Sequence, residues 1–329
     1  MLFRSLSTFT NHYNIYSDVE AVAGNYYHNA VILKNGKIIT WGRAYHGDGA
    51  GLGHDQTYAY NEIVNTPREV QNITNAKSVV WGNYNANAGT AAAVLKDGRV
   101  MRWGRFLGSV PVPVSWQDWP NEKAVQVQMT GNGSDNLFIL LDTGRIKVSA
   151  ANHHWVNGGA DSSTNYLIPN LTNIIQIENG THSMYALASD GAVYSWGYIS
   201  TSTEHLGRAG LQVNTHHPVG QVDGIGPGSG AIKIVTDTRW GYVVLFEDGS
   251  MKAWGTPPPG VGGSTIISPI ALTGFPPMET LFRTQSSMYG MTKAGKFIAW
   301  GGYINNWASA SSGNVYVRSE EHTSELQSP

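Results

Sequence analysis

The chain has 329 residues and no cysteine, and its 21 Lys and Arg residues nearly balance its 23 Asp and Glu residues. Without cysteine, the protein has no disulfide framework, no zinc-thiolate site and no cysteine nucleophile. The sequence has no basic run, which argues against a phosphate-binding surface and a nucleic-acid partner. It also has no apolar run approaching the roughly 18 residues of a membrane span. Charged residues make up only 13% of a chain with 11 Trp and 16 Tyr, which slightly favours an extracellular or virion-associated protein.

A short motif recurs along the chain: a glycine followed five residues later by Trp-Gly. The sixth copy keeps the glycine but has Ser149 in place of the tryptophan. Repeats of about 50 residues are typical of propellers and solenoids. The motif glycines are separated by 62, 46, 47, 58 and 46 residues. The repeat residues are Gly36 with Trp41, Gly98 with Trp103, Gly144, Gly191 with Trp196, Gly249 with Trp254, and Gly295 with Trp300.

Each repeat predicts three antiparallel strands and, in five of the six, a fourth. The motif glycine lies between two apolar runs, and Asn35-Gly36 or Asp97-Gly98 predicts a two-residue type I′ hairpin turn. First strands are expected over 19–23, 78–81, 124–128, 173–177, 231–235 and 279–282. Fourth strands, each near a proline that an edge strand tolerates, are expected over 67–70, 112–114, 168–171, 217–219 and 269–272. The predicted fold is therefore an all-β propeller of four-stranded blades with six recognisable repeats.

The repeated tryptophans are predicted to pack between neighbouring blades, because identical spacing in every repeat is what a structural role requires. A ring of aromatic binding residues is the alternative. Ser149 cannot fill the volume of an indole, so the third blade is predicted to be the weakest packed. Replacing Ser149 with Trp should be tolerated if its pocket is vacant, and should destabilise the fold by about 1–3 kcal/mol if the pocket is full.

These motifs resemble the repeats of the regulator of chromosome condensation family. The resemblance covers about 20–310 and is carried by Gly24 and His28, by Gly51-Leu52-Gly53, and by Gly180, His182, Asp190-Gly191 and Leu206-Gly207. It implies a propeller that usually has seven blades, so we expect this chain to be truncated from seven. It also implies protein–protein contact, with guanine-nucleotide exchange on small GTPases or β-lactamase inhibition in some members.

Both ends of the chain resemble translated sequencing adapter. A codon series for Arg318-Ser319-Glu320-Glu321 has a reverse complement that encodes Leu2-Phe3-Arg4-Ser5. We therefore expect 1–5 and 318–329 to be adapter-derived and 6–317 to be a single domain of propeller repeats from a metagenomic fragment. On this interpretation the native N-terminus is missing, and removing both ends should leave the melting temperature unchanged.

No catalytic constellation is found, so we predict a non-enzyme with no cofactor and no metal. Gly49-x-Gly51-x-Gly53 lacks the βαβ context of a nucleotide loop and is interpreted as a turn between strands. The pairs His153-His154 and His216-His217 are interpreted as exposed loop histidines, because adjacent strand residues point to opposite faces and rarely chelate one ion. His28 and His182 are expected to bond backbone carbonyls.

The segments after the Trp-Gly motifs are uneven in length and rich in aromatics. Loops on a rigid scaffold often carry binding, so we predict a partner surface there. The candidate binding residues are Tyr45, His46, Tyr58, Tyr60, Trp116, Trp119 and Trp155. The predicted function is recognition of a protein partner through one propeller face, as part of a phage or bacterial surface protein. The alternatives are a glycan-binding or glycan-cleaving propeller, a small-GTPase exchange factor, and aromatics that only cover blade edges.

Overall fold

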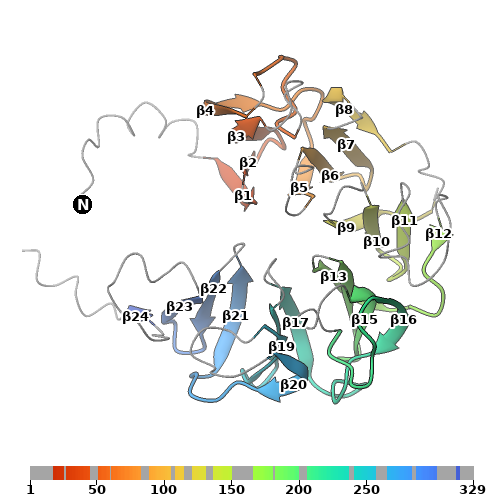
Figure 1. The fold of residues 1–329 in the computed structure, drawn as a ribbon. Coiled ribbons are helices and arrows are strands. Elements are labelled where there is room, and N and C mark those ends of the chain that lie inside the picture. The colour runs from red at the N-terminus through yellow and green to blue at the C-terminus, as the bar shows by residue number, and fades with distance from the viewer. Residues whose placement is uncertain are drawn as a thin grey trace, which may run out of the picture. The chain divides into compact units, whose positions relative to one another are not determined.

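The fold consists of antiparallel β-sheets, each of four strands that are consecutive in the chain (Figure 1). In the described residues there are strands, turns and bends but no helix, and therefore none with the length and hydropathy of a membrane span. The prediction of an all-β fold of six four-stranded blades is confirmed. The computed structural model describes residues 18–25, 27–44, 51–59, 61–82, 89–104, 108–114, 121–130, 136–149, 166–180, 182–199, 206–236, 241–256, 265–283, 287–301 and 316–318.

The chain divides into two compact units, Met1–Asp142 and Thr143–Pro329. The boundary falls in the third blade, between its second and third strands. The first unit contains blade 1, blade 2 and the first half of blade 3. Its strands are β1 (Val19–Gly24), β2 (His28–Leu33), β3 (Ile38–Ala44), β4 (Glu62–Glu69), β5 (Ala76–Trp81), β6 (Thr90–Leu95), β7 (Val100–Gly104), β8 (Gly108–Pro113), β9 (Ala124–Thr130) and β10 (Asn136–Leu141).

The second unit contains the rest of blade 3 and blades 4 to 6. Its strands are β11 (Ile146–Ser149), β12 (Tyr166–Leu167), β13 (Ile174–Asn179), β14 (Ser183–Ala188), β15 (Val193–Ile199), β16 (Thr215–Gln221), β17 (Ala231–Thr236), β18 (Gly241–Phe246), β19 (Met251–Gly255), β20 (Ile266–Ala271), β21 (Met278–Arg283), β22 (Ser287–Thr292), β23 (Phe297–Gly301) and β24 (Tyr316–Arg318). Sheet order follows chain order in blades 4, 5 and 6.

The hairpin between the second and third strands differs from the predicted type I′ turn. In blade 1 the Gly36 amide donates to the Leu33 carbonyl at 2.7 Å, and the Leu33 amide donates to the Lys37 carbonyl at 2.9 Å. Gly36 has a φ of 79°, whereas Asn35 is not in the positive-φ region that a type I′ turn requires. The loop is therefore a three-residue turn that closes with a left-handed glycine. The Asn35 side-chain oxygen accepts from the Lys37 amide at 3.0 Å, which explains Asn or Asp before this glycine.

The turn glycine also fixes the approach of the next blade. The Gly36 carbonyl accepts from the Ala76 amide at 2.8 Å, and a Cβ on Gly36 would lie 2.5 Å from the Asn75 Cα. The same carbonyl-to-amide bond joins Gly98 to Ala124, Gly144 to Ile174 and Gly249 to Met278. A single glycine therefore provides both the positive φ of the turn and the space for the neighbouring backbone.

The glycine of each Trp-Gly motif is required for a different reason from the turn glycine. Gly42 has a φ of 131° and faces the backbone before β2, where the Tyr27 carbonyl accepts from the Arg43 amide at 2.8 Å. A Cβ on Gly42 would clash with that carbonyl. The pairing of β3 with β4 shifts register between Thr40 and Gly42, so the motif forms a β-bulge.

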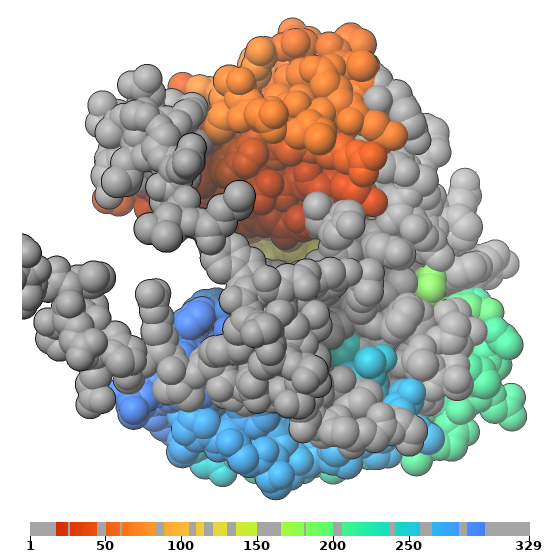
Figure 2. Space-filling view, turned by 60° about the vertical axis from the view of Figure 1, so that its left-hand side comes forward, coloured from red at the N-terminus to blue at the C-terminus, as the bar shows by residue number. Residues whose placement is uncertain are grey.

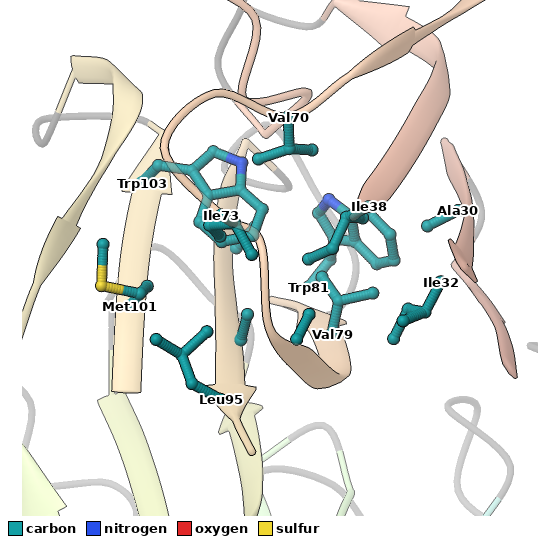
Figure 3. Close-up of a cluster of buried hydrophobic side chains, with 13 residues drawn as sticks. Ala30, Ile32, Ile38, Val70, Ile73, Val79, Trp81, Leu95, Met101 and Trp103 are labelled. Carbon is teal, nitrogen blue, oxygen red and sulfur yellow. The ribbon is translucent and has the colours of Figure 1, made fainter. Parts of the chain in front are cut away.

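Two of the motif tryptophans, Trp103 and Trp254, pack between neighbouring blades. Trp103 of blade 2 is fully buried in a cluster with Ile38 and Val70 of the preceding repeat, and Figure 3 shows Trp103 beside Ile73 and Val70. Figure 2 shows residues 18–44 (red) lying against residues 51–82 (orange), a range that includes the last strand of blade 1 and the first strand of blade 2. Trp254 of blade 5 is fully buried among residues of blade 4.

Ser149, at the tryptophan position of blade 3, is only 8% exposed. The position is therefore covered, and nothing in the described residues identifies a vacancy at it. The proposed weakness of blade 3, and any plug formed by Trp155, stay predictions.

The last strand reaches into a segment interpreted from sequence as adapter. Arg318 is the final residue of β24, and its backbone is paired with Phe297. The remaining residues of 1–5 and 318–329 lie outside the described residues. The expectation that both ends can be removed without effect stays a prediction.

Candidate functional site: the ends of the blades

Six of the seven predicted binding residues lie outside the described residues: Tyr45, His46, Tyr60, Trp116, Trp119 and Trp155. The seventh, Tyr58, is only 5% exposed and packs with Ala44, Leu52 and Val64. Tyr58 is therefore part of the scaffold of blade 1 and contributes no ring to an exposed patch. The other six positions stay predictions.

Tyr58 belongs to a chain of hydrogen bonds that holds the segment after the first Trp-Gly. The Thr40 hydroxyl donates to the Leu52 carbonyl at 2.5 Å, so its oxygen is left to accept from His54 Nε2 at 2.9 Å. His54 then carries its proton on Nε2, and Nδ1 accepts from the Tyr58 hydroxyl at 2.7 Å. Burial lowers the pKa of His54 to about 4, so the ring is neutral near pH 7. Both nitrogens are occupied, which makes His54 a structural group rather than a base.

In blade 4, the segment after the Trp-Gly motif is held by a different side chain. The Ser195 hydroxyl donates to the Leu206 carbonyl at 2.6 Å, as Thr40 does to Leu52. Arg208 takes the position of His54, and its guanidinium donates to the Pro218 carbonyl at 3.0 Å. Gly53 and Gly207 give equivalent clearance, because a Cβ on either would lie 3.0 Å from the indole of the next blade, Trp103 or Trp254. The Leu-Gly part of the motif therefore seats the tryptophan of the following blade.

The two histidines matched by sequence are not equivalent in register. His28 pairs with Gly42, whereas the residue that pairs with Gly197 is Ser183. His182 instead corresponds to Tyr27, because its carbonyl accepts from the Tyr198 amide at 2.9 Å. One additional residue between His182 and its turn glycine produced the mismatch.

His28 serves the junction between blades 1 and 2. The ring is fully buried, stacks on Trp81 at 5.7 Å between centroids, and shares a hydrogen bond of 3.1 Å between Nδ1 and the Asn25 side-chain oxygen. The ring therefore contacts a side-chain carbonyl, and a backbone hydrogen bond at Arg43, of the kind we expected, partly offsets the effect of burial on the pKa of His28. Burial lowers the pKa of His28 to about 3, which excludes a role as a base near pH 7.

The expectation of exposed loop histidines is wrong for His216 and His217. Both lie in β16; His217 is 7% exposed and its Nε2 donates to the Gln212 carbonyl at 2.8 Å. His216 packs against the Tyr198 ring at 4.8 Å. His153 and His154 lie outside the described residues. Among the described residues, no group of three or more His, Asp or Glu side chains is arranged to hold a metal.

Connectivity separates Trp116 and Trp119 from the other aromatic candidates. The second Trp-Gly is followed by β8 after only 105–107, so these two tryptophans belong to the connection from β8 to β9. At the start of that connection the Val114 amide donates to the Val100 carbonyl, and at its end the Ala124 amide donates to the Gly98 carbonyl. Both anchors lie at the turn-glycine end of blade 2. The segments containing Tyr45 and Trp155 instead leave from the Trp-Gly end of their blades.

Sequence reasoning missed a set of polar side chains on the first strands of blades 4 to 6. The Gln176 amide nitrogen donates to the Ile234 carbonyl at 2.7 Å, and its oxygen accepts from the Ile234 amide at 2.9 Å. Lys233 Nζ donates to the Thr280 hydroxyl at 3.1 Å. Burial lowers the pKa of Lys233, and nearby Glu178 opposes that shift. All three residues follow the bulge of a first strand, so an alignment of the repeats on their first strands would have found them.

A scan against protein-family models finds no match. Protein pim1 of Schizosaccharomyces pombe is 27% identical over 183 residues, which cover 55% of this chain and 27% of that protein. RCC1 domain-containing protein RUG3, mitochondrial, of Arabidopsis thaliana is 29% identical over 189 residues, covering 52% of this chain and 40% of that protein. The chain thus spans well under half the length of these two relatives.

Solved structures agree on the fold. Prp20p from Saccharomyces cerevisiae superposes with a TM-score of 0.66 at 14% identity, over 92% of this chain and 77% of that chain. Human WBSCR16 superposes with a TM-score of 0.61 at 17% identity, over 86% of this chain and 76% of that chain.

The blade order, the turn glycines and the buried tryptophans define a β-propeller built of tandem repeats. In sequence, the repeats are similar to those of RCC1-like proteins, among them the RCC1 domain-containing protein RUG3.

Proposed function

We propose that this protein is a non-enzymatic recognition module that binds a protein partner at the Trp-Gly end of its blades. One observation carries the proposal: the two ends of a blade are used differently. At the turn-glycine end, the turn carbonyls of Gly36, Gly98, Gly144 and Gly249 bond the next blade directly, which commits that end to the scaffold. At the Trp-Gly end, the third strands lead into segments of very different length, such as 45–61 and 105–107.

The solved relatives support a protein as the partner class. One solved structure is that of Kap60 bound to yeast RCC1 (Prp20), and another, of Prp20p, is described together with its binding properties to Gsp1p and histones. For this chain, a small GTPase of the Gsp1p type is accordingly the first partner to test. The near-neutral charge makes histones and nucleic acid weaker candidates.

The test compares aromatic pairs at the two ends of the blades. The variant Tyr45→Ala/Tyr60→Ala removes rings at the Trp-Gly end, and Trp116→Ala/Trp119→Ala is the matched control anchored at the other end. Binding of purified Gsp1p to the immobilised chain, and release of its labelled nucleotide, are measured for each. We expect the first pair to lose binding by at least tenfold, or about 1.4 kcal/mol, because tyrosines are enriched among the few residues that contribute most of the binding energy of an interface. Loss in the control pair alone would contradict the proposed face, and no binding by the unaltered chain would remove this partner.

A further inference from the structure

The hairpin turn of blade 1 contains an Asn-Gly pair, Asn35-Gly36, where three other blades have Asp-Gly. The equivalent acids in blades 2, 4 and 5 are Asp97, Asp190 and Asp248. In all four turns the side-chain oxygen makes the same hydrogen bond. It accepts from the amide two residues further along, at 3.0 Å in blades 1 and 2, 2.9 Å in blade 4 and 2.8 Å in blade 5. The turn therefore requires an oxygen at this position, which aspartate supplies as well as asparagine does.

An asparagine before a glycine has a chemical reactivity that an aspartate at the same place lacks. Asparagine is a thermolabile residue, and a following glycine leaves the next backbone nitrogen unhindered. The Gly36 nitrogen attacks the Asn35 Cγ, and the side-chain NH2 group leaves as ammonia with the backbone proton. One water then opens the resulting succinimide ring. Opening at the Cγ carbonyl gives aspartate, and opening at the main-chain carbonyl gives isoaspartate, whose backbone runs through Cβ and Cγ.

The folded turn of blade 1 restrains the attacking nitrogen. The Gly36 amide donates to the Leu33 carbonyl at 2.7 Å, and the Gly36 carbonyl accepts from the Ala76 amide of blade 2 at 2.8 Å. Because the attack needs a free Gly36 nitrogen, it requires the turn to open. The rate in the folded chain is then the rate in the open chain multiplied by the fraction of molecules in which the turn is open. Blade 2 lowers this fraction by holding the carbonyl.

The second Asn-Gly pair that the structure describes is protected more strongly. Asn179 is only 2% exposed, and its carbonyl accepts from the Thr236 hydroxyl at 2.8 Å. The Gly180 amide donates to the Ser183 carbonyl at 2.8 Å. Asn35, in contrast, is exposed to the water that opens the ring. Two further pairs, at 132–133 and 157–158, lie outside the described residues.

We propose that Asn35 is a site of spontaneous deamidation, and that its two products have different effects on the junction between blades 1 and 2. Aspartate reproduces the turn of blade 2, where Asp97 accepts the same backbone hydrogen bond. Isoaspartate adds one backbone atom before Gly36. This glycine is buried, and even a Cβ on it would lie 2.5 Å from the Asn75 Cα. The added atom therefore displaces the carbonyl that bonds Ala76, so the isoaspartate form loses the junction that the aspartate form keeps.

The experiment is peptide mapping of the full chain by mass spectrometry after incubation at mildly alkaline pH, folded in one sample and unfolded in urea in another. In urea Asn35 and Asn179 should convert at similar rates, which is the internal control. In the folded chain Asn35 should convert at least about tenfold more slowly than in urea, which corresponds to an opening free energy of about 1.4 kcal/mol, and still faster than Asn179. A folded chain in which Asn35 stays intact, or converts no faster than Asn179, would overturn the proposal. Equal rates for Asn35 in the two samples would contradict protection by the turn.

An asparagine placed in the turn of blade 4 tests the part played by the next blade. There the Gly191 carbonyl is held by the Ser229 hydroxyl at 2.7 Å. Asp190→Asn creates the reactive pair, and Asp190→Asn/Ser229→Ala creates it without this hydrogen bond. We expect the double variant to deamidate at this position several-fold faster than the single variant. Equal rates in the two variants would show that the next blade does not control the reaction.

The two products are compared by their resistance to urea. Asn35→Asp is the matched control for the aspartate product, and its urea midpoint should equal that of the unaltered chain. The isoaspartate form, separated chromatographically from the incubated chain and identified by enzymatic methylation, should unfold at a lower urea concentration. An isoaspartate form as stable as Asn35→Asp would overturn the assigned effect on the junction.

Discussion

The junction between blades 1 and 2 and the junction between blades 4 and 5 place the same backbone features in contact through different side chains. In the first, the Gly36 carbonyl accepts directly from the Ala76 amide at 2.8 Å. In the second, the linker is longer, and the Ser229 hydroxyl donates to the Gly191 carbonyl at 2.7 Å while its oxygen accepts from the Ala231 amide. A hydroxyl thus replaces one backbone bond.

The aromatic contents of the two junctions differ as well. His28 stacks on Trp81 in the first, and the Trp81 indole donates to the Gly51 carbonyl at 2.7 Å. In the second, Tyr185 and Tyr242 lie 4.4 Å apart between ring centroids, and both pack on Trp254. The comparison teaches that the repeat specifies the turn glycine and the tryptophan, while the volume around them can be filled in several ways.

The largest expected effect tests whether a motif tryptophan stabilises the protein by filling the junction between two blades. Trp103→Ala removes an indole that is fully buried between blades and should destabilise the protein by about 3–5 kcal/mol. Trp41→Ala should cost less, because its indole is only partly buried. Chemical denaturation followed by fluorescence measures both, and equal losses would contradict the role of the covering blade.

The turn glycines provide the next test of the comparison. Alanine at Gly36 would meet the backbone of Asn75 at 2.5 Å, whereas at Gly191 the nearest atoms lie 3.2 Å away. Both positions have a positive φ, which by itself disfavours alanine by about 1–2 kcal/mol. Gly36→Ala should therefore lose roughly 3 kcal/mol or more and Gly191→Ala only the smaller amount. The urea midpoints of the two variants measure these losses, and a larger loss of stability in Gly191→Ala than in Gly36→Ala would contradict the explanation.

Much of the fold was predictable because the repeat is a backbone requirement. The turn glycine must adopt a positive φ and the tryptophan must fill a junction, so the number of residues between them is fixed. This spacing located every blade. The turn type was wrong because Asn35 acts by accepting a hydrogen bond from Lys37 rather than by adopting a positive φ itself. Spacing cannot distinguish these two uses of one residue type.

The candidate site was less predictable from the sequence. Whether a side chain is buried, and at which end of its blade it lies, depends on the path of the fourth strand. Tyr58 follows the Trp-Gly motif like an exposed loop residue, yet its hydroxyl bonds His54 inside blade 1. Trp116 and Trp119 were grouped with the Trp-Gly segments although the fourth strand expected over 112–114 already ends before them, as β8 (Gly108–Pro113) does. Side chains that bridge first strands, such as Gln176, carry no motif at all.

Acid should weaken the first unit through its buried histidines. The pKa of His28 falls to about 3 and that of His54 to about 4, both below the ordinary value near 6.5, because burial opposes the charged ring. Below pH 6.5 these two histidines bind protons in the unfolded chain but stay neutral in the folded chain. The free energy of unfolding therefore decreases as the pH falls. At pH 5 the loss should be about 2 kcal/mol for His28 and somewhat less for His54. Urea midpoints at pH 7.5 and pH 5 should converge in His28→Gln/His54→Gln, and an unchanged difference would contradict this account.

The smallest effect concerns the ion pair that only one of the two junctions has. Glu20 and Lys96 join blades 1 and 2 at 2.8 Å, with side chains about two-fifths exposed, whereas the equivalent positions between blades 4 and 5 are Ile175 and Glu247. Exposed pairs of this kind stabilise by about 1 kcal/mol or less and weaken with salt. A double-mutant cycle with Glu20→Gln and Lys96→Met should give a coupling within that range.

Transferring the pair to the second junction sharpens the same test. Ile175→Glu alone would face Glu247 and should destabilise the protein slightly, because the charges are alike. Adding Glu247→Lys should reverse the loss and create a coupling similar to that of Glu20 with Lys96, since the bulge and turn positions are equivalent in the two junctions. The measurement is the difference in urea midpoint at low and high salt. A coupling that is absent at low salt would mean that the equivalence of the junctions ends at the backbone and does not extend to the charged side chains at their edge.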